Sequence, residues 1–254
     1  MITILKKDLA NYFKSPIAYV TTTFLLLLCG YLFFIRVVHY SMVSMQAMMN
    51  PMYAKSLLIN DQIVVPLLNN TAFLMLFFTP LFTMRLFSEE KKLGTLELLF
   101  TYPLTETQLI FGKLFSCAAV VLLGGLLTAT FPLTLFKYVQ NMDWSSVITG
   151  YLGIVLMSIA AISIGMWISS LTDSQIVAAF STFASLLMFW IIGWTGTASP
   201  GPLSKFLTSI SFLDNFDNFT KGVIDLNSVL FFVCFSILFL YLTYYNLISR
   251  KWRG

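Results

Sequence analysis

The chain has 254 residues, of which 58% are hydrophobic and only 10% are charged, and its formal net charge is +4. Average soluble domains are roughly 45–50% apolar and about 25% charged. This composition therefore excludes a disordered chain, a collagen-like fibre and a small disulfide scaffold, and it argues against a water-soluble globule. The three cysteines lie far apart in apolar runs, without the spacing of a metal site.

The first predicted element is an amphipathic helix over residues 1–14. Ile2, Leu5, Leu9 and Tyr12 follow helical spacing, and Lys6, Lys7, Asp8, Asn11 and Lys14 fall elsewhere. Such a helix lies flat in the membrane interface with its lysines near anionic headgroups. The alternative is a short extension that only anchors the chain. Ser15-Pro16 separates this helix from the first apolar run, because proline disfavours helix at the residue before it.

Six runs lack Asp, Glu, Lys and Arg, and each is long enough to supply the roughly 20 helical residues that cross a bilayer. The predicted spans cover residues 17–36, 63–86, 114–136, 147–171, 175–194 and 228–248. Helix is the required form, because lipid offers no partners for backbone polar groups. We expect an all-α integral membrane protein in which residues 1–254 form a single transmembrane domain.

The distribution of basic residues predicts the orientation of these spans. With the N-terminus inside, the inner segments hold ten of the fifteen Lys and Arg residues and the outer segments hold five. Cytoplasmic loops carry the excess of basic residues, so both termini are predicted to be cytoplasmic. Two sequences, Thr105 to Gln108 and Thr172 to Gln175, read as capping boxes that open the third and fifth spans.

The outer loop between spans one and two is rich in methionine. Met42, Met45, Met49 and Met52 lie at helical spacing, and His39 precedes them. Thioether and imidazole ligands suit Cu(I). The alternative is an adaptable apolar face on an outer helix, which we favour because no cysteine joins the set.

Inside the predicted spans, Asn69 and Asn70 form the most polar pair. They are candidates for lining a pathway, and the alternative is hydrogen bonding between helices. All eleven carboxylates lie outside the charge-free runs. Since a charge within the membrane usually marks a proton or ion route, its absence from the sequence argues against a proton-coupled transporter.

The inner loop 87–113 concentrates charge in a charge-poor chain. Glu89, Glu90, Lys91, Lys92 and Glu97 fall within nine residues. Gly94 is suited to end one helix, and Thr95 to start a second that Pro103 ends. Leu96, Leu98, Leu99 and Phe100 give that second helix an apolar surface, which suits docking into the groove of a partner. The alternative is an ordinary solvated loop.

In the outer segment 195–227, a turn-rich TGTASPGP sequence precedes an apolar stripe. Leu203, Phe206, Leu207 and Ile210 form this stripe, which predicts a helix that lies in the interface or re-enters the membrane.

The chain lacks the sequence motifs with which a protein would hydrolyse ATP without a partner. It contains no G-x-x-x-x-G-K-[ST] phosphate loop and no zinc-binding cluster, and His39 is its only histidine. If the protein moves a cargo, the work must therefore come from a partner, and loop 87–113 is the best-equipped place to receive it.

At this loop the sequence resembles the permeases of type-2 ABC transporters. The residues that carry the resemblance are Glu89, Glu90, Gly94, Thr95, Glu97, Leu98, Leu99, Pro103, Gly112 and Lys113. The stretch 212–226, FLDNFDNFTKGVIDL, is similar to the segment before the last span in the same family, and within it to the gliding-motility permease branch of Bacteroidetes. The six-span plan and the amphipathic start match as well.

The resemblance implies the membrane subunit of an ATP-driven exporter in the bacterial inner membrane. A second permease subunit, identical or homologous, would complete the translocation path, and two separate ATPase subunits would bind the ATP and Mg²⁺. The coupling residues would be Glu89, Glu90, Gly94, Thr95, Leu96, Glu97, Leu98, Leu99 and Pro103. The interface helix, with Leu5, Lys6, Lys7, Leu9 and Lys14, would contact the ATPase or the membrane surface. We expect no cofactor or metal in this chain and no nucleic-acid partner.

Two other classes remain as alternatives. A non-transporting membrane scaffold would use the same loop to recruit a cytoplasmic protein. An intramembrane enzyme is disfavoured by the absence of acid, base and metal-ligating groups from the predicted spans.

Overall fold

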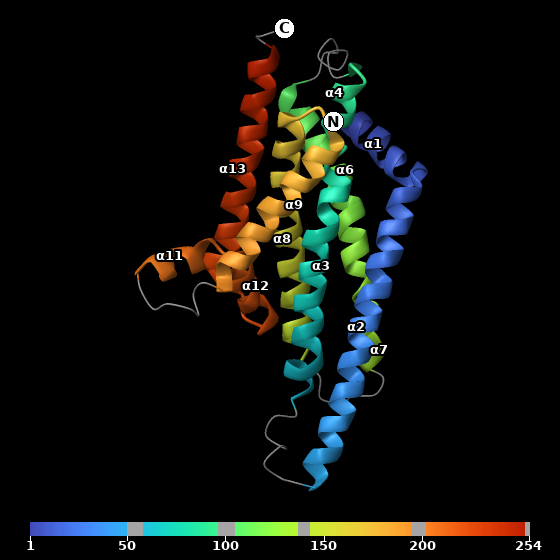
Figure 1. Ribbon diagram of the computed structural model, residues 1–254, viewed down its shortest axis with the longest axis vertical. Helices are drawn as coiled ribbons and strands as arrows, with labels where there is room; N and C mark the ends of the chain where they lie inside the picture. The colour runs from blue at the N-terminus through green and yellow to red at the C-terminus, as the bar shows by residue number, and fades with distance from the viewer. Residues whose placement is uncertain (50–57, 96–104, 137–142, 195–201, 252–254) are drawn as a thin grey trace.

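The computed structural model describes residues 1–49, 58–95, 105–136, 143–194 and 202–251 (Figure 1). Within these ranges the chain is helical and forms no strand. The elements are α1 (Ile2–Lys14), α2 (Pro16–Met49), η2 (Asn60–Val64), α3 (Val65–Thr83), α4 (Ser88–Lys92), α6 (Glu106–Leu127), α7 (Thr130–Phe136), α8 (Trp144–Leu171), α9 (Gln175–Ile191), η3 (Ile192–Trp194), α11 (Pro202–Ile210), α12 (Phe212–Thr220) and α13 (Leu226–Lys251).

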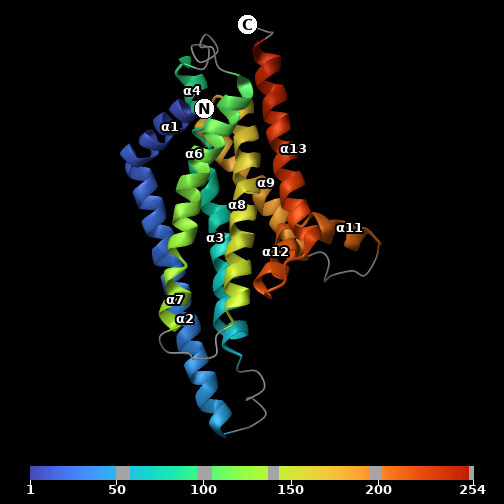
Figure 2. The ribbon, with the colours of Figure 1, turned by 180° about the vertical axis from the view of Figure 1, so that it is seen from behind.

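Six helical stretches are long and apolar enough to cross a membrane, which confirms the predicted all-α fold class. These stretches are Pro16–Ala47, Asn60–Lys92, Glu106–Phe136, Trp144–Leu171, Gln175–Trp194 and Leu226–Ser249. Consecutive stretches run in opposite directions along the bundle, and α8 lies among α3, α6, α9 and α13 (Figures 1 and 2). We call the end of the bundle that holds α1 and α4 the α4 end.

The first span was predicted over residues 17–36, but helix α2 continues to Met49 and reaches beyond the other helices at the end opposite α4 (Figure 1). Arg36 therefore lies inside a helix and does not end it. A charge limits the apolar run but leaves the backbone hydrogen bonds of a helix intact, so the end of the run was the wrong marker for the end of the helix. His39, Met42 and Met45 lie on this continuation and are exposed.

The third predicted span, 114–136, is interrupted in the structure. α6 ends at Leu127, and α7 begins at Thr130. The Thr128 hydroxyl donates to the carbonyl oxygen of Gly125 at 2.6 Å and lies 3.1 Å from the Tyr151 hydroxyl of α8. Pro132 has no N–H group for a bond back to the preceding turn, which accounts for the break at this position.

Helices α3 and α8 run parallel with a constant register. Gly150 lies against Leu68, Gly165 lies against Thr83, and the Ser169 hydroxyl meets the backbone of Phe87. Each pair is offset by 82 positions. A Cβ at either glycine would collide with the facing side chain, so the small residues of α8 let the two helices approach closely.

The segment before the last span forms two helices, whereas the sequence predicted one. α11 projects away from the bundle, and α12 turns back to pack on α8 (Figure 1). The Thr149 hydroxyl of α8 donates to the carbonyl oxygen of Phe219 at 2.7 Å. The side chains of Phe212, Phe216 and Phe219 are fully buried, so α12 is part of the core.

Of the two predicted capping boxes, the first forms its N-cap hydrogen bond. Thr105 is the N-cap of α6, and its hydroxyl accepts from the backbone N–H of Gln108 at 3.4 Å. The prediction for Thr172 is wrong, because α9 begins after Ser174 and Ser174 makes no side-chain capping bond. The Thr172 hydroxyl instead accepts from the N–H of Ser174 at 3.2 Å, which forms a local turn between α8 and α9.

Candidate functional site

The turn that leads from α3 into α4 is held by one serine of α8. The Ser169 hydroxyl accepts from the backbone N–H groups of both Phe87 and Ser88, each at 3.1 Å. The same hydroxyl donates to the carbonyl oxygen of Met84 at 3.2 Å. Phe87 and Ser88 are fully buried. The Ser169 side chain of α8 therefore fixes the backbone from which α4 begins.

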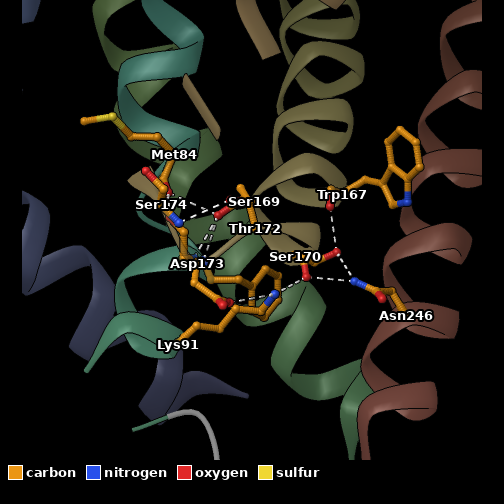
Figure 3. A network of polar contacts seen from close by, with 11 residues as sticks. Met84, Lys91, Trp167, Ser169, Ser170, Thr172, Asp173, Ser174 and Asn246 are labelled. Atoms are coloured by element: carbon orange, nitrogen blue, oxygen red, sulfur yellow. Dashed lines mark hydrogen bonds and ion pairs between the residues drawn. The ribbon is translucent and has the colours of Figure 1, made fainter. Parts of the chain in front are cut away.

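Lys91 extends this attachment from α4 to the C-terminal end of α8 (Figure 3). Only 1% of its side chain is exposed, and its ammonium group donates to the carbonyl oxygen of Ser170 and lies 3.7 Å from Asp173 Oδ1. Asn246 of α13 donates to the same carbonyl oxygen at 2.8 Å and to the Ser170 hydroxyl at 2.9 Å. The last carbonyls of a helix lack partners within it and form the negative end of its dipole. Lys91 and Asn246, from two different helices, satisfy one of them, the Ser170 carbonyl.

A second buried lysine, Lys113 of α6, joins α4 to α1. Its ammonium group lies 2.9 Å from Glu90 Oε1 and 3.5 Å from Asp8 Oδ2, and 3% of its side chain is exposed. Lys7 adds a longer contact of 3.8 Å to Glu90. A buried charge is tolerated only when it is paired, so Lys113 holds the carboxylates of two separate helices in place.

Helix α1 packs closely on α6 along the side that carries Ile4, Asp8 and Tyr12. A Cβ at Gly112 would lie 3.1 Å from Ile4 Cγ2, so glycine permits this approach. The Tyr12 hydroxyl donates to the carbonyl oxygen of Phe82 at 3.0 Å. Burial raises the pKa of Tyr12 well above its ordinary value, so the hydroxyl stays protonated and remains a donor.

A half-open cavity of about 440 Å³ lies between α1, α4 and the start of α6. Six charged residues line it: Lys7, Asp8, Arg85, Glu89, Glu90 and Lys113. The cavity brings together cations and anions from three helices and from the turn after α3.

The structure places part of the predicted coupling set in this region. Glu89 and Glu90 lie on α4, and the Thr95 hydroxyl donates to the carbonyl oxygen of Glu90 at 3.2 Å. Gly94 follows α4 with a φ of +67°, a conformation that favours glycine. Leu96, Glu97, Leu98, Leu99, Phe100 and Pro103 lie outside the described residues.

The predicted interface residues divide between the two sides of α1. Lys6, Lys7 and Lys14 are exposed, and Leu5 and Leu9 are half-buried. The sequence pattern assigned Asp8 to the polar side, but this residue is buried beside Lys113. Ile2, assigned to the apolar side, is 69% exposed.

The other candidates lie away from the α4 end. Asn69 and Asn70 fall in the first half of α3, where Asn69 Oδ1 is buried without a hydrogen-bond partner among the described residues. Met52 lies outside those residues. Within the part of the chain that the structure describes, no three His, Cys, Asp or Glu residues form a group that could hold a metal ion.

Sequence patterns did not single out Arg85, Lys91, Asn246 or Asp8 as site residues. One clue was available for Lys113, which directly precedes the long apolar run that begins at residue 114. A lysine at that depth needs either water or a buried partner, and its partners are 23 and 105 positions away in sequence.

No curated protein matches the sequence. A family model, described as ABC-2 family transporter protein, matches residues 2–250. The match covers nearly the whole chain, including all six candidate spans, and agrees with the resemblance carried by loop 87–113. The protein therefore belongs to the ABC-2 family of transporter membrane proteins, as a multi-pass permease subunit.

Proposed function

We propose that this permease subunit belongs to an ATP-driven exporter and receives the work of a separate ATPase at the α4 end. The observation that carries the proposal is the buried contact of Lys113 with Glu90 of α4 and Asp8 of α1. A load applied to α4 or α1 would pass through this lysine to α6. Packed helices respond to such a load as rigid bodies and do not bend locally.

The Lys91 contacts offer a second route from the same helix. They connect α4 with the end of α8 and with α13 through the Ser170 carbonyl. A displacement of α4 would therefore act on three of the six candidate spans, α6, α8 and α13. This is the arrangement expected of an input element that switches a bundle between two packed states.

We further propose that the α4 end faces the cytoplasm of a bacterial cell and that both termini lie there. The two-to-one excess of basic residues in the inner segments supports this orientation. ATP and Mg²⁺ would be bound by the partner, of which two copies are expected. A second permease subunit would pack against this chain, and the exposed apolar side chains of α2, α9 and α13 are available for that partner and for lipid.

The coupling is tested by co-purifying the permease with its ATPase, for which an adjacent ATPase reading frame is the first candidate. The double variant Glu89→Arg with Glu97→Arg should lower permease-stimulated ATP turnover or abolish ATPase binding. Asp61→Arg is the matched control, because Asp61 is exposed in η2 at the opposite end. Full stimulation by the double variant would count against this docking site.

Transport itself requires a second measurement. Flux of candidate cargo in vesicles that contain both subunits separates an exporter from a scaffold that only recruits the ATPase. ATPase binding without ATP-dependent flux, across the cargo classes tested, would favour the scaffold.

A further inference from the structure

The cavity at the α4 end is lined by a guanidinium group, that of Arg85, which has few hydrogen-bond partners among the described residues. Arg85 Nε is buried without a hydrogen-bond partner among the described residues, and Nη1 reaches only the Ser15 hydroxyl at 3.5 Å. No ion pair of Arg85 occurs within the described ranges. A guanidinium presents five donors in a planar fork that fits phosphate oxygens. Arg85 therefore has unused capacity for an anion at the cavity wall.

The same cavity is also lined by a carboxylate that could bind a cation. Glu90 uses Oε1 to contact Lys113 and Lys7, whereas its Oε2 is buried without a partner in the described part of the chain. Glu89 lines the cavity too. A buried carboxylate oxygen without a partner is costly, and an ammonium group would satisfy it.

The position of the cavity indicates the source of such a ligand. The amphipathic helix α1 supplies Lys7, Asp8 and Asn11 to the lining, and a helix of this type lies at the depth of lipid headgroups. Leu93 also lines the cavity and is 68% exposed. Its side chain provides apolar surface beside the charged wall, where an acyl chain would lie.

We propose that this cavity binds the phosphoethanolamine headgroup of a membrane lipid. The phosphate contacts Arg85, and the primary ammonium contacts Glu90 and Glu89. The volume of about 440 Å³ falls within the range of about 300–1,000 Å³ typical of small-molecule sites. Because the lipid binds the permease chain itself, this site does not depend on the proposed ATPase coupling.

The test measures lipid retained by the purified full-length chain after extraction from nanodiscs that contain phosphatidylethanolamine, phosphatidylglycerol or phosphatidylcholine. We expect selective retention of phosphatidylethanolamine, since the second lipid lacks the ammonium and the third lacks its N–H donors. Arg85→Gln should weaken retention about tenfold or more. Lys221→Gln is the matched control, because it removes one positive charge from an exposed position at the end of α12 that does not line the cavity, and it should leave retention unchanged.

Glu89→Gln provides an independent variant, which should reduce the preference for phosphatidylethanolamine while leaving Arg85 in place. Thermal unfolding of each variant checks that it is folded. Unchanged retention in Arg85→Gln, or equal retention of the three lipids by the unaltered chain, would overturn the proposal. Binding of soluble O-phosphoethanolamine as tightly as the lipid would also overturn it, by showing that the ligand is a free phosphate compound.

Discussion

Lys113 Nζ of α6 lies 2.9 Å from Glu90 Oε1 of α4, with only 3% of the lysine side chain exposed. The contact joins a membrane-spanning helix to a five-residue helix at the bundle end. Asp8 completes the arrangement from α1 at 3.5 Å. Three elements that differ in length and direction are thus held by one ammonium group.

Replacement of Lys113 by methionine should be strongly destabilising. Methionine keeps most of the side-chain volume but leaves Glu90 and Asp8 without their main partner. Removing one member of a buried ion pair costs about 3–5 kcal/mol, and thermal or denaturant unfolding in detergent measures the loss.

Lys221→Met is the control for this change. Lys221 is 62% exposed and pairs with Asp217 at 2.5 Å, four positions away on the surface. Exposed pairs contribute about 0–1 kcal/mol, so this variant should unfold close to the unaltered protein. Equal stability losses in the two variants would contradict the role assigned to the buried lysine.

Gly112→Ala should disturb the packing of α1 on α6. The new Cβ would lie 3.1 Å from Ile4 Cγ2, and overpacking of this kind costs about 1–3 kcal/mol. Hydrogen exchange across α1, compared with the unaltered protein, measures the effect directly.

Gly124→Ala is the matched control on the same helix. Its Cβ would meet Thr22 Cγ2 at 3.7 Å, which is an ordinary contact. This variant should keep the protection of α1 unchanged. Loss of α1 protection here, or full α1 protection in Gly112→Ala, would show that the close approach at Gly112 is not what positions α1.

Asn246→Leu should separate ATPase binding from stimulation. The change removes both hydrogen bonds to Ser170, so α13 loses these bonds to the end of α8 while α4 keeps the surface proposed to dock the ATPase. We expect co-purification of the ATPase to persist and permease-stimulated ATP turnover to fall.

Asn227→Leu is the corresponding control, since Asn227 lies exposed in the first turn of α13 at the far end of the same helix. Its stimulation should match that of the unaltered permease. An Asn246→Leu variant with normal stimulation would remove α13 from the proposed route of coupling.

The sequence was sufficient to predict six long helices because lipid restricts the chain to charge-free apolar runs. The sequence did not predict where these helices end, because Arg36, which limits the first apolar run, lies inside α2. A helix continues wherever its backbone bonds are satisfied, and apolarity reports only the membrane-facing part. The register of α3 on α8 depends on which side chains face each other, which hydropathy does not encode.

The candidate site was predicted in part for a similar reason. Charge density identified Glu89 and Glu90, but the partners of Glu90 come from α1 and α6. Asp8 follows Ile4 by one helical turn and precedes Tyr12 by another, so it lies on the buried side of α1. A carboxylate in that position can be explained only when Lys113, 105 residues later, is placed beside it. The family match supports the permease assignment, and the gliding-motility branch stays a prediction.

The orientation of the bundle can be measured with cysteines placed at its two ends. Lys92 is an exposed residue of α4, and Met45 is exposed on the extension of α2 at the opposite end, so Lys92→Cys and Met45→Cys report on the two ends. Cys234 is exposed whereas Cys29 and Cys117 are buried, so the variants belong in a Cys234→Ser background. In intact spheroplasts a membrane-impermeant maleimide should label position 45 at once. It should reach position 92 only after permeabilisation, because the excess of basic residues in the inner segments predicts a cytoplasmic α4 end. The reverse pattern would move the α4 end to the outside, where no ATPase can act on it.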